Sequence, residues 1–258
     1  MITLFFTSCS SDDMNDDLSG EGNMKVYFDN SVDGDDLLLD SSLYTNSTGE
    51  TLKISRFNYI VSNFVLIDEM GNEFTYPSEE SYFIISEEEN QLSLDLSNVP
   101  SGNYTSMKFG VGVPMERFNQ GETAQQEFWD YAQTFNLTWA WVAGYKFFNY
   151  EGKYTAPTVD GEKNFKVHLG NLGDQDNYRE VTLNFPNTAR VRTDETPDVH
   201  LVVDANQILD GETKIELAPV LNDGGTSPYM FDPIFAEPIA NNAKTMFSVD
   251  HIHTSSTH

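Results

Sequence analysis

Two histidines near the end of the chain have a spacing that can hold a metal ion. His251 and His253 are separated by a single residue. On a β-strand, residues two apart point to the same face and lie about 6.5–7 Å apart along the chain. Imidazole nitrogens suit copper, zinc or nickel, so the pair could close on one ion once a third ligand arrives from another strand. The alternative is that both histidines are exposed in a C-terminal tail.

Two further histidines fall within predicted strands. His168 lies in the run at residues 164–170, and His200 lies in the run at residues 199–204. Either could be a core residue, or could orient the ligands of a metal. The residue pattern alone therefore leaves the third ligand open.

Two tryptophans form a second group of residues with chemical potential. Trp139 and Trp141 lie at residues 137–148, a proline-free run of aromatic and aliphatic side chains that predicts a strand. In a strand, both indoles would share one face. Tryptophan in a strand is most often a core residue. Because indole is easily oxidised, the other interpretation is that one of the two is a reacting or modified group.

The remainder of the chain predicts many short strands. Runs such as residues 91–96 and 179–185 alternate apolar and polar side chains, and turns rich in glycine or proline separate them. A helical stripe of apolar residues predicts one inserted helix at 123–135, with Trp129 off the stripe as a lid or surface contact. The predicted fold class is all-β, an antiparallel β-sandwich of Ig-like or jelly-roll-like type.

The composition narrows the classes of partner. The 258 residues are 39% hydrophobic and 13% aromatic, which is enough for a buried core. Only 14 Lys and Arg face 41 Asp and Glu, for a net charge of −27. This balance excludes nucleic acid as a partner and disfavours direct adsorption to anionic lipid. Solubility outside the cell explains such a charge, and attraction of cations is the functional alternative.

The start of the chain resembles the end of a bacterial lipoprotein signal. A short apolar run leads through small residues to Cys9, the single cysteine. The run is shorter than a full signal core and lacks a basic segment. We therefore expect a truncated lipoprotein signal and acidic tether at 1–23, acylated at Cys9 and anchored to the membrane, and a single domain at 24–253. The expected location is the bacterial cell envelope, as an outer-membrane lipoprotein facing the periplasm or the exterior.

Familiar catalytic templates are absent from the sequence. It has no glycine-rich phosphate loop, no Gly-x-Ser-x-Gly elbow and no His-Glu-x-x-His motif. We therefore expect a binding protein and not an enzyme. One alternative function is a non-enzymatic surface module for glycan binding or adhesion, in which Trp129 and Tyr131 would stack on a sugar.

A longer set of motifs resembles the MbnP-like family. Its most specific part is the Trp-x-Trp-x-x-Gly-Tyr block at 139–145 with Glu-Gly following, and it continues with Val-His-Leu-Gly at 167–170 and His-x-His at 251–253. The family resembles exported copper-binding proteins associated with methanobactin operons. In that group, a partner di-haem peroxidase of the MauG type converts a tryptophan to kynurenine, and the product helps to bind copper.

The resemblance implies roles for particular residues of this chain. Trp139 or Trp141 would be the modified residue. His251 and His253 would be candidate copper ligands close to the Trp-x-Trp strand, and His168 would be a third ligand or a residue that orients the ligands. On this view, the chain is the substrate of an enzyme.

Overall fold

The structure is a computed structural model that describes residues 18–220, 229–230 and 233–256. The predicted signal with Cys9 lies outside the described residues. The strands are β1 (Glu21–Val32), β2 (Asp35–Asp36), β3 (Tyr44–Thr45), β4 (Thr51–Asp68), β5 (Glu73–Thr75), β6 (Tyr82–Ser86), β7 (Ser93–Pro100), β8 (Gly102–Val111), β9 (Phe148–Thr155), β10 (Lys163–Leu169), β11 (Arg179–Val191), β12 (Glu195–Asp204), β13 (Tyr229–Met230) and β14 (Phe247–Ser256). The α-helices are α1 (Met115–Phe118), α2 (Gln126–Thr134), α3 (Gln207–Asp210) and α4 (Pro233–Ala243).

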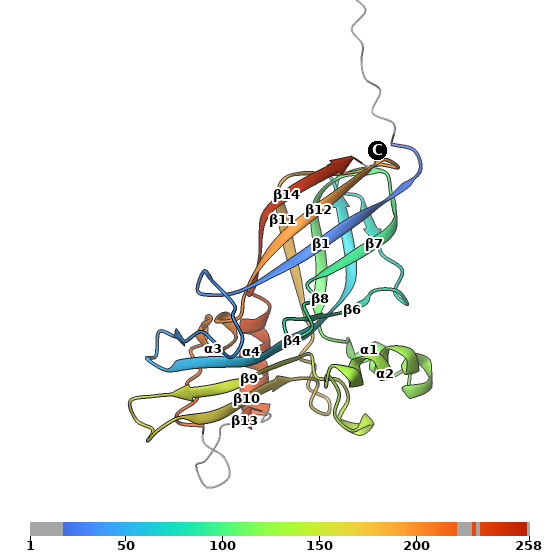
Figure 1. The fold of residues 1–258 in the computed structure, drawn as a ribbon. Helices are drawn as coiled ribbons and strands as arrows, with labels where there is room; N and C mark the ends of the chain where they lie inside the picture. The colour runs from blue at the N-terminus through green and yellow to red at the C-terminus, as the bar shows by residue number, and fades with distance from the viewer. Residues whose placement is uncertain (1–17, 221–228, 231–232, 257–258) are drawn as a thin grey trace, which may run out of the picture.

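The strands form two sheets, as the predicted β-sandwich requires. A five-stranded sheet has the order β14-β12-β1-β2, with β7 also paired to β1. A nine-stranded sheet has the order β11-β8-β4-β9-β10-β13, with β3, β5 and β6 paired to β4. Figure 1 shows β14, β12, β1 and β7 together in the upper part of the molecule. Most neighbouring strands are antiparallel, but β1 and β12 run parallel, so the sandwich is not purely antiparallel.

Strand β4 connects the two halves of the larger sheet. Its second half pairs with β8 from Val61 onwards, and its first half pairs with β9 up to Tyr59. The larger sheet therefore extends below the sandwich, where α4 contacts β10 (Figure 1).

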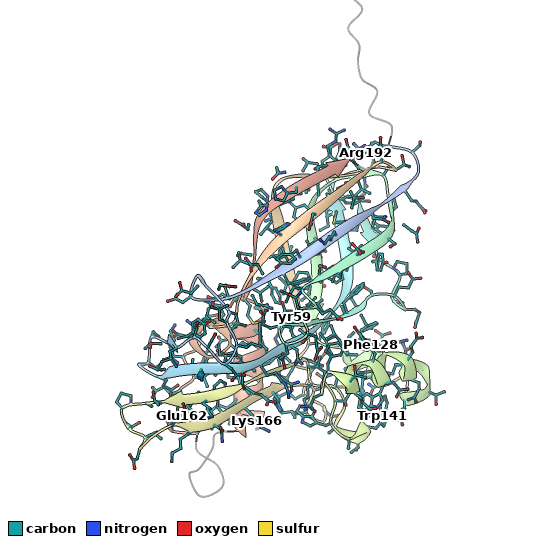
Figure 2. All side chains as sticks on the ribbon, viewed as in Figure 1. Tyr59, Phe128, Trp141, Glu162, Lys166 and Arg192 are labelled. Atoms are coloured by element: carbon teal, nitrogen blue, oxygen red, sulfur yellow. The ribbon has the colours of Figure 1, made fainter. Side chains whose placement is uncertain are left out.

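Aromatic side chains fill the space between the sheets. Phe28 of β1 contacts Phe109 of β8 edge to face, and Phe109 contacts Phe247 of β14 in the same manner, with ring centroids 5.1 Å apart. Tyr59, labelled near the middle of the molecule in Figure 2, is fully buried beside Phe28. Burial of such rings is the main favourable contribution to packing the two sheets. It also decides which face of each strand points outward.

The predicted helix at 123–135 is confirmed as a 3₁₀ turn at Glu122–Gln125 followed by α2. It is not the longest helix, since α4 spans Pro233–Ala243 with a proline inside it. Trp129 is only 3% exposed, so its prediction as a surface contact was wrong. Within the ranges that the structure describes, no helix has the length and continuous apolar character needed to cross a membrane.

The predicted strand at residues 137–148 was also wrong. Trp141–Ala143 form a short 3₁₀ turn, and Gly144 has a φ of 77°, a conformation that favours glycine. The backbone N–H of Trp139 donates to the carbonyl of Gly144 at 3.0 Å, which closes a tight loop. The two indoles therefore do not align on one face, and β9 begins only at Phe148.

Candidate metal centre

The outward face of β12 presents a histidine at the middle of the strand. Val199, Leu201 and Val203 are fully buried and point into the sandwich. Because successive strand residues alternate between faces, His200 points away from the core. The burial of its three neighbours thus determines the direction of this imidazole.

Strand β14 brings the two C-terminal histidines beside His200. In the antiparallel pairing, His251 lies opposite His200 and His253 lies opposite Asp198. The register then shifts, because Leu201 pairs with Val249 and Asp250 is passed over. This irregularity is a β-bulge, a feature that redirects side chains locally. Beyond it, His251 and His253 lie on the same outer face as His200.

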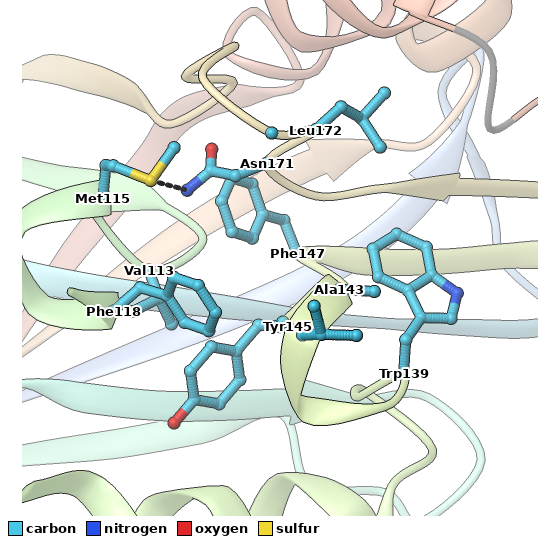
Figure 3. Close-up of a pocket in the computed structure, with 12 residues that line it drawn as sticks. Val113, Met115, Phe118, Trp139, Ala143, Tyr145, Phe147, Asn171 and Leu172 are labelled. Atoms are coloured by element: carbon cyan, nitrogen blue, oxygen red, sulfur yellow. Dashed lines mark hydrogen bonds between the residues drawn. The ribbon is translucent and has the colours of Figure 1, made fainter. Parts of the chain in front are cut away.

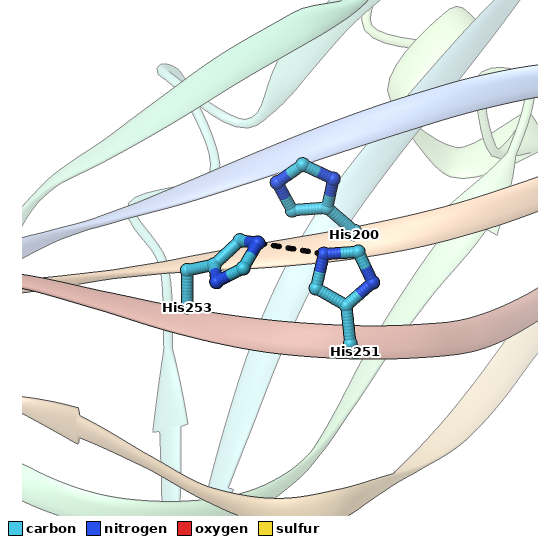
Figure 4. Close-up of side chains that lie close together, drawn as sticks. All are labelled: His200, His251 and His253. Carbon is cyan, nitrogen blue, oxygen red and sulfur yellow. Dashed lines mark hydrogen bonds between the residues drawn. The ribbon is translucent and has the colours of Figure 1, made fainter.

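The three imidazoles form a compact group, which we call the histidine triad (His200, His251 and His253). One ring nitrogen from each lies within 4.8 Å of the other two. Figure 4 shows the three rings converging above β12 and β14. The rings of His200 and His251 stack with centroids 4.4 Å apart, and the ring of His253 stands at 90° to that of His200. The sequence prediction that a third ligand would come from another strand therefore has a specific candidate in His200.

The hydrogen bonds of the triad favour a cation between its rings. The carboxylate of Asp250 accepts a hydrogen bond from His251 Nδ1 at 2.6 Å. In the neutral ring this leaves the lone pair on His251 Nε2, which lies 2.9 Å from His253 Nε2. Two nitrogens bound to one tetrahedral ion at about 2.0–2.1 Å would lie about 3.3 Å apart. Small side-chain rotations therefore suffice for an ion to replace the proton of the hydrogen bond between His251 and His253.

Carboxylates surround the triad. Asp198 Oδ1 lies 3.5 Å from His200 Nε2, and its other oxygen lies 3.3 Å from Lys25 Nζ. The phenol of Tyr27 packs against the His200 ring, with centroids 5.1 Å apart. Asp198 and Asp250 thus place two carboxylates in contact with the triad, a charge that favours a cation, and Lys25 offsets part of the charge of Asp198.

The structure does not bring His168 into the triad. His168 lies on β10 in the larger sheet, where its Nε2 contacts Glu151 Oε1 at 2.6 Å. Burial lowers the pKa of His168, although the hydrogen bond to Glu151 opposes that change. The neutral ring therefore donates its Nε2–H to an ionised Glu151.

Trp139 and Trp141 have different surroundings. The Trp139 ring lies beside His168, with centroids 6.4 Å apart. Trp141 packs instead against Trp129 and Phe118, with centroids 4.7 and 4.9 Å apart. Of the predicted site residues, the structure thus joins Trp139 to His168 at the larger sheet, and His251 to His253 on the smaller sheet. The expectation that the C-terminal histidines and the tryptophans form one shared site was therefore wrong.

Trp139 also lines a cavity of about 480 Å³ (Figure 3). Its walls are mainly apolar, and Phe118, Tyr145 and Phe147 contribute aromatic rings. Asn171 supplies a polar group, with its Nδ2 4.0 Å from the sulfur of Met115. One face of the Trp139 indole is therefore accessible from a pocket and not fully enclosed by the core.

Trp129 and Tyr131, the side chains that the alternative glycan hypothesis requires, do not form an exposed aromatic surface together. Trp129 is buried against Trp141 and Tyr145. Tyr131 is 41% exposed, and its hydroxyl hydrogen-bonds to Gln91. A buried indole cannot stack on a sugar, so Trp129 does not support that hypothesis.

Comparison with known families places these features in context. A family model described as MbnP matches residues 21–225. This chain belongs to the MbnP family. The matched range includes all three tryptophans and His200 but ends before His251 and His253. The family match therefore supports the domain and not the complete triad.

A solved structure gives the same architecture for this member of the MbnP family. MbnP from Methylosinus trichosporium superimposes with a TM-score of 0.51 at 14% sequence identity, over 91% of this chain and 99% of that chain. At this identity, the likeness shows a shared fold alone. The comparison with curated proteins gives no significant match.

His200 is the ligand candidate that sequence reasoning did not select. Its run alternates, with His200 on the polar side of buried Val199 and Leu201, and this was the available signal. The alternation predicts an outward histidine but does not identify the neighbouring strand. Pairing of β12 with β14, which lies about fifty residues further along, supplies that information.

Proposed function

We propose that this chain is an exported copper-binding protein whose metal site is the histidine triad. The observation that carries the proposal is the convergence of three imidazole nitrogens within 4.8 Å on one outward sheet face. Imidazole is a favoured ligand of copper, and the surrounding carboxylates attract cations. Membership of the MbnP family is consistent with this role. The protein would bind and hold copper without catalysing a reaction itself.

We further propose that Trp139 is the tryptophan that a MauG-type di-haem peroxidase oxidises to kynurenine. Trp139 is favoured over Trp141 because its indole lies beside His168 and lines a cavity. Trp141, which is equally half-buried, packs against Trp129 and Phe118 and does not line that cavity. Kynurenine carries an aromatic amine and a ketone, so oxidation would add nitrogen and oxygen donors next to the imidazole of His168, which lies in the other sheet from the histidine triad.

The cellular setting is also part of the proposal. Acylation at Cys9 would anchor the protein to the outer membrane through the acidic segment that follows. The domain would then face the periplasm or the exterior, where it meets both copper and the peroxidase. Mass spectrometry of protein from a native host would detect the lipid, and the kynurenine mass gain on the peptide containing Trp139.

Metal titration of purified variants tests the triad. We expect the double substitution His251→Ala and His253→Ala to abolish high-affinity copper binding, and His200→Ala to weaken it at least about tenfold. His168→Gln is the matched control, because it removes a histidine from the other sheet and should leave this affinity unchanged. Full copper affinity in His200→Ala together with loss in His168→Gln would reject the triad as the site.

A further inference from the structure

We infer that the cavity beside Trp139 is a binding site for a small, uncharged, planar aromatic molecule that carries a carbonyl group. The cavity measures about 480 Å³, within the range of about 300–1,000 Å³ that is typical of small-molecule sites. It lies at the larger sheet, whereas the histidine triad lies on the smaller one. The inference depends neither on copper binding nor on oxidation of Trp139.

Aromatic rings determine the shape of the cavity. Phe118 lies at the end of α1, and Trp139, Tyr145 and Phe147 lie in the segment that leads into β9. Tyr145 and Phe147 are buried, so the surrounding core fixes their rings, while Phe118 and Trp139 are half-buried. Such rings favour offset-stacked or edge-to-face contacts with another aromatic ring. The walls therefore favour a planar aromatic ligand.

The cavity has no charged wall. Among the described residues, no Asp, Glu, Lys, Arg or His lines it, although the whole chain has a net charge of −27. An ion that moved from water into these surroundings would lose its hydration without gaining a partner of opposite charge. An uncharged ligand avoids this cost.

Asn171 supplies a hydrogen-bond donor in a fixed direction. The backbone N–H of Asn177 donates to Asn171 Oδ1 at 2.9 Å, so the other end of the amide, Nδ2, carries the N–H groups. Within the part of the chain that the structure describes, the one partner of Nδ2 is the sulfur of Met115 at 4.0 Å (Figure 3). A thioether is a weak acceptor, and the carbonyl oxygen of a ligand would be a stronger one.

The loop that carries Asn171 is held in place before any ligand arrives. Asn177 is fully buried, and its Nδ2 donates to the carbonyl of Gly170 at 2.7 Å. Leu172 and Gln175 exchange two backbone hydrogen bonds, of 3.1 and 3.0 Å. A donor that is already ordered loses little conformational entropy when it binds. The cavity thus combines aromatic walls with one preorganised donor.

Three naphthalene probes test the class of ligand. The compound 2-acetylnaphthalene carries the carbonyl, 2-isopropenylnaphthalene has a CH₂ group in place of its oxygen, and 2-naphthoate carries a negative charge. Equilibrium dialysis against the full chain measures the affinity for each. We expect the ketone to bind at a single site, and the carboxylate to bind at least about tenfold more weakly than the ketone.

The substitution Asn171→Asp tests the donor. It keeps the oxygen that accepts from Asn177 and replaces the Nδ2 donor with a second acceptor. We expect it to weaken binding of the ketone at least about tenfold and binding of the hydrocarbon by less than about threefold. Asn184→Asp is the matched control, because it makes the same change at an exposed position of β11 and should alter neither affinity.

The substitution Ala143→Trp tests the location. Ala143 is exposed and lines the cavity, so a bulky ring there should fill the space and abolish binding of both the ketone and the hydrocarbon. Because this position is exposed, the test stands even if Asn171→Asp fails to fold. Unchanged binding of the ketone in Ala143→Trp, or no saturable binding to the unmodified chain, would overturn the site. Equal losses of ketone and hydrocarbon in Asn171→Asp would overturn the role of the donor.

These outcomes are distinguishable from failure of the proposed function. The double variant of His251 and His253 should bind the ketone as the unmodified chain does, because the triad lies on the other sheet. Conversely, Ala143→Trp should keep the copper affinity of the unmodified chain. Loss of ketone binding in the double variant would contradict the assignment to this cavity.

Discussion

At the scale of single residues, the contact between His168 and Glu151 connects two ionisable side chains of adjacent strands. Burial lowers the pKa of His168. Burial alone would raise the pKa of Glu151, but the hydrogen bond from His168 and the positive charges nearby, including Arg56, outweigh it and lower that pKa. Both shifts favour a neutral imidazole beside an ionised carboxylate near neutral pH.

These pKa shifts predict that the pair lowers the free energy of unfolding in acid. Below the ordinary histidine pKa of 6.5, the unfolded chain takes up a proton that native His168 resists. Stability from both groups is therefore present at neutral pH and is lost as the pH falls. We expect His168→Gln, which retains an N–H donor for Glu151, to lose less unfolding free energy than the unmodified protein between about pH 7.5 and pH 5. Denaturant unfolding at several pH values measures this, and identical losses would contradict it.

The glycine after β10 is a second residue whose size matters. A Cβ on Gly170 would overlap the Trp139 ring and the carbonyl oxygen of Tyr145. We therefore expect Gly170→Ala to destabilise the fold by about 1–3 kcal/mol and to change the Trp139 fluorescence.

The matched control for that substitution is Gly173→Ala. Gly173 has a φ of 60°, and a Cβ there meets nothing within 4 Å. Its substitution should cost backbone strain only and leave the indole in place. Similar fluorescence changes in both variants would show that Trp139 does not depend on the space at Gly170.

At the scale of elements, the triad depends on the pairing of β12 with β14. One candidate ligand comes from β12 and two come from β14, so an ion held by all three would connect the strands. The bulge at Asp250 and the burial of Phe247 on the opposite face define the orientation of β14. Metal affinity and strand pairing are therefore linked: binding to the native state alone stabilises it.

This linkage predicts a stabilising effect of metal. At a free Cu(II) concentration of about 100 times the dissociation constant, we expect the native state to gain about 2.7 kcal/mol and the melting temperature to rise. Addition of a strong chelator should reverse the rise. The same titration on the His251→Ala, His253→Ala double variant should give no rise, and an equal rise there would assign the effect to another site.

At the scale of the whole molecule, the excess of acidic residues affects both stability and metal capture. The net charge is −27 over 258 residues, and the triad lies on an outward sheet face. Repulsion among so many like charges opposes the compact state, while the same field increases the local concentration of cations. Salt weakens both effects, so it should raise the stability of the protein and slow its capture of cations.

The charge predicts that salt stabilises the metal-free protein. Raising NaCl from about 10 mM to about 150 mM shortens the screening length from about 30 Å to about 8 Å, which weakens the repulsion. We expect the melting temperature to rise over this range and the association rate of Cu(II) to fall. Equal concentrations of KCl should act alike, and a melting temperature that falls with either salt would contradict the argument.

Local patterns in the sequence determined the strand-rich class, the helix at α2 and the common face of His251 and His253. Each of these depends on periodicity within one short segment, which local geometry imposes. The tertiary structure alone decided that His200, and not His168, completes the triad, because only strand pairing between distant segments brings those imidazoles together. It likewise decided that the segment around Trp139 and Trp141 is a turn, since Gly144 adopts a positive φ and the packing of Trp141 on Trp129 outweighs the strand propensity of the run.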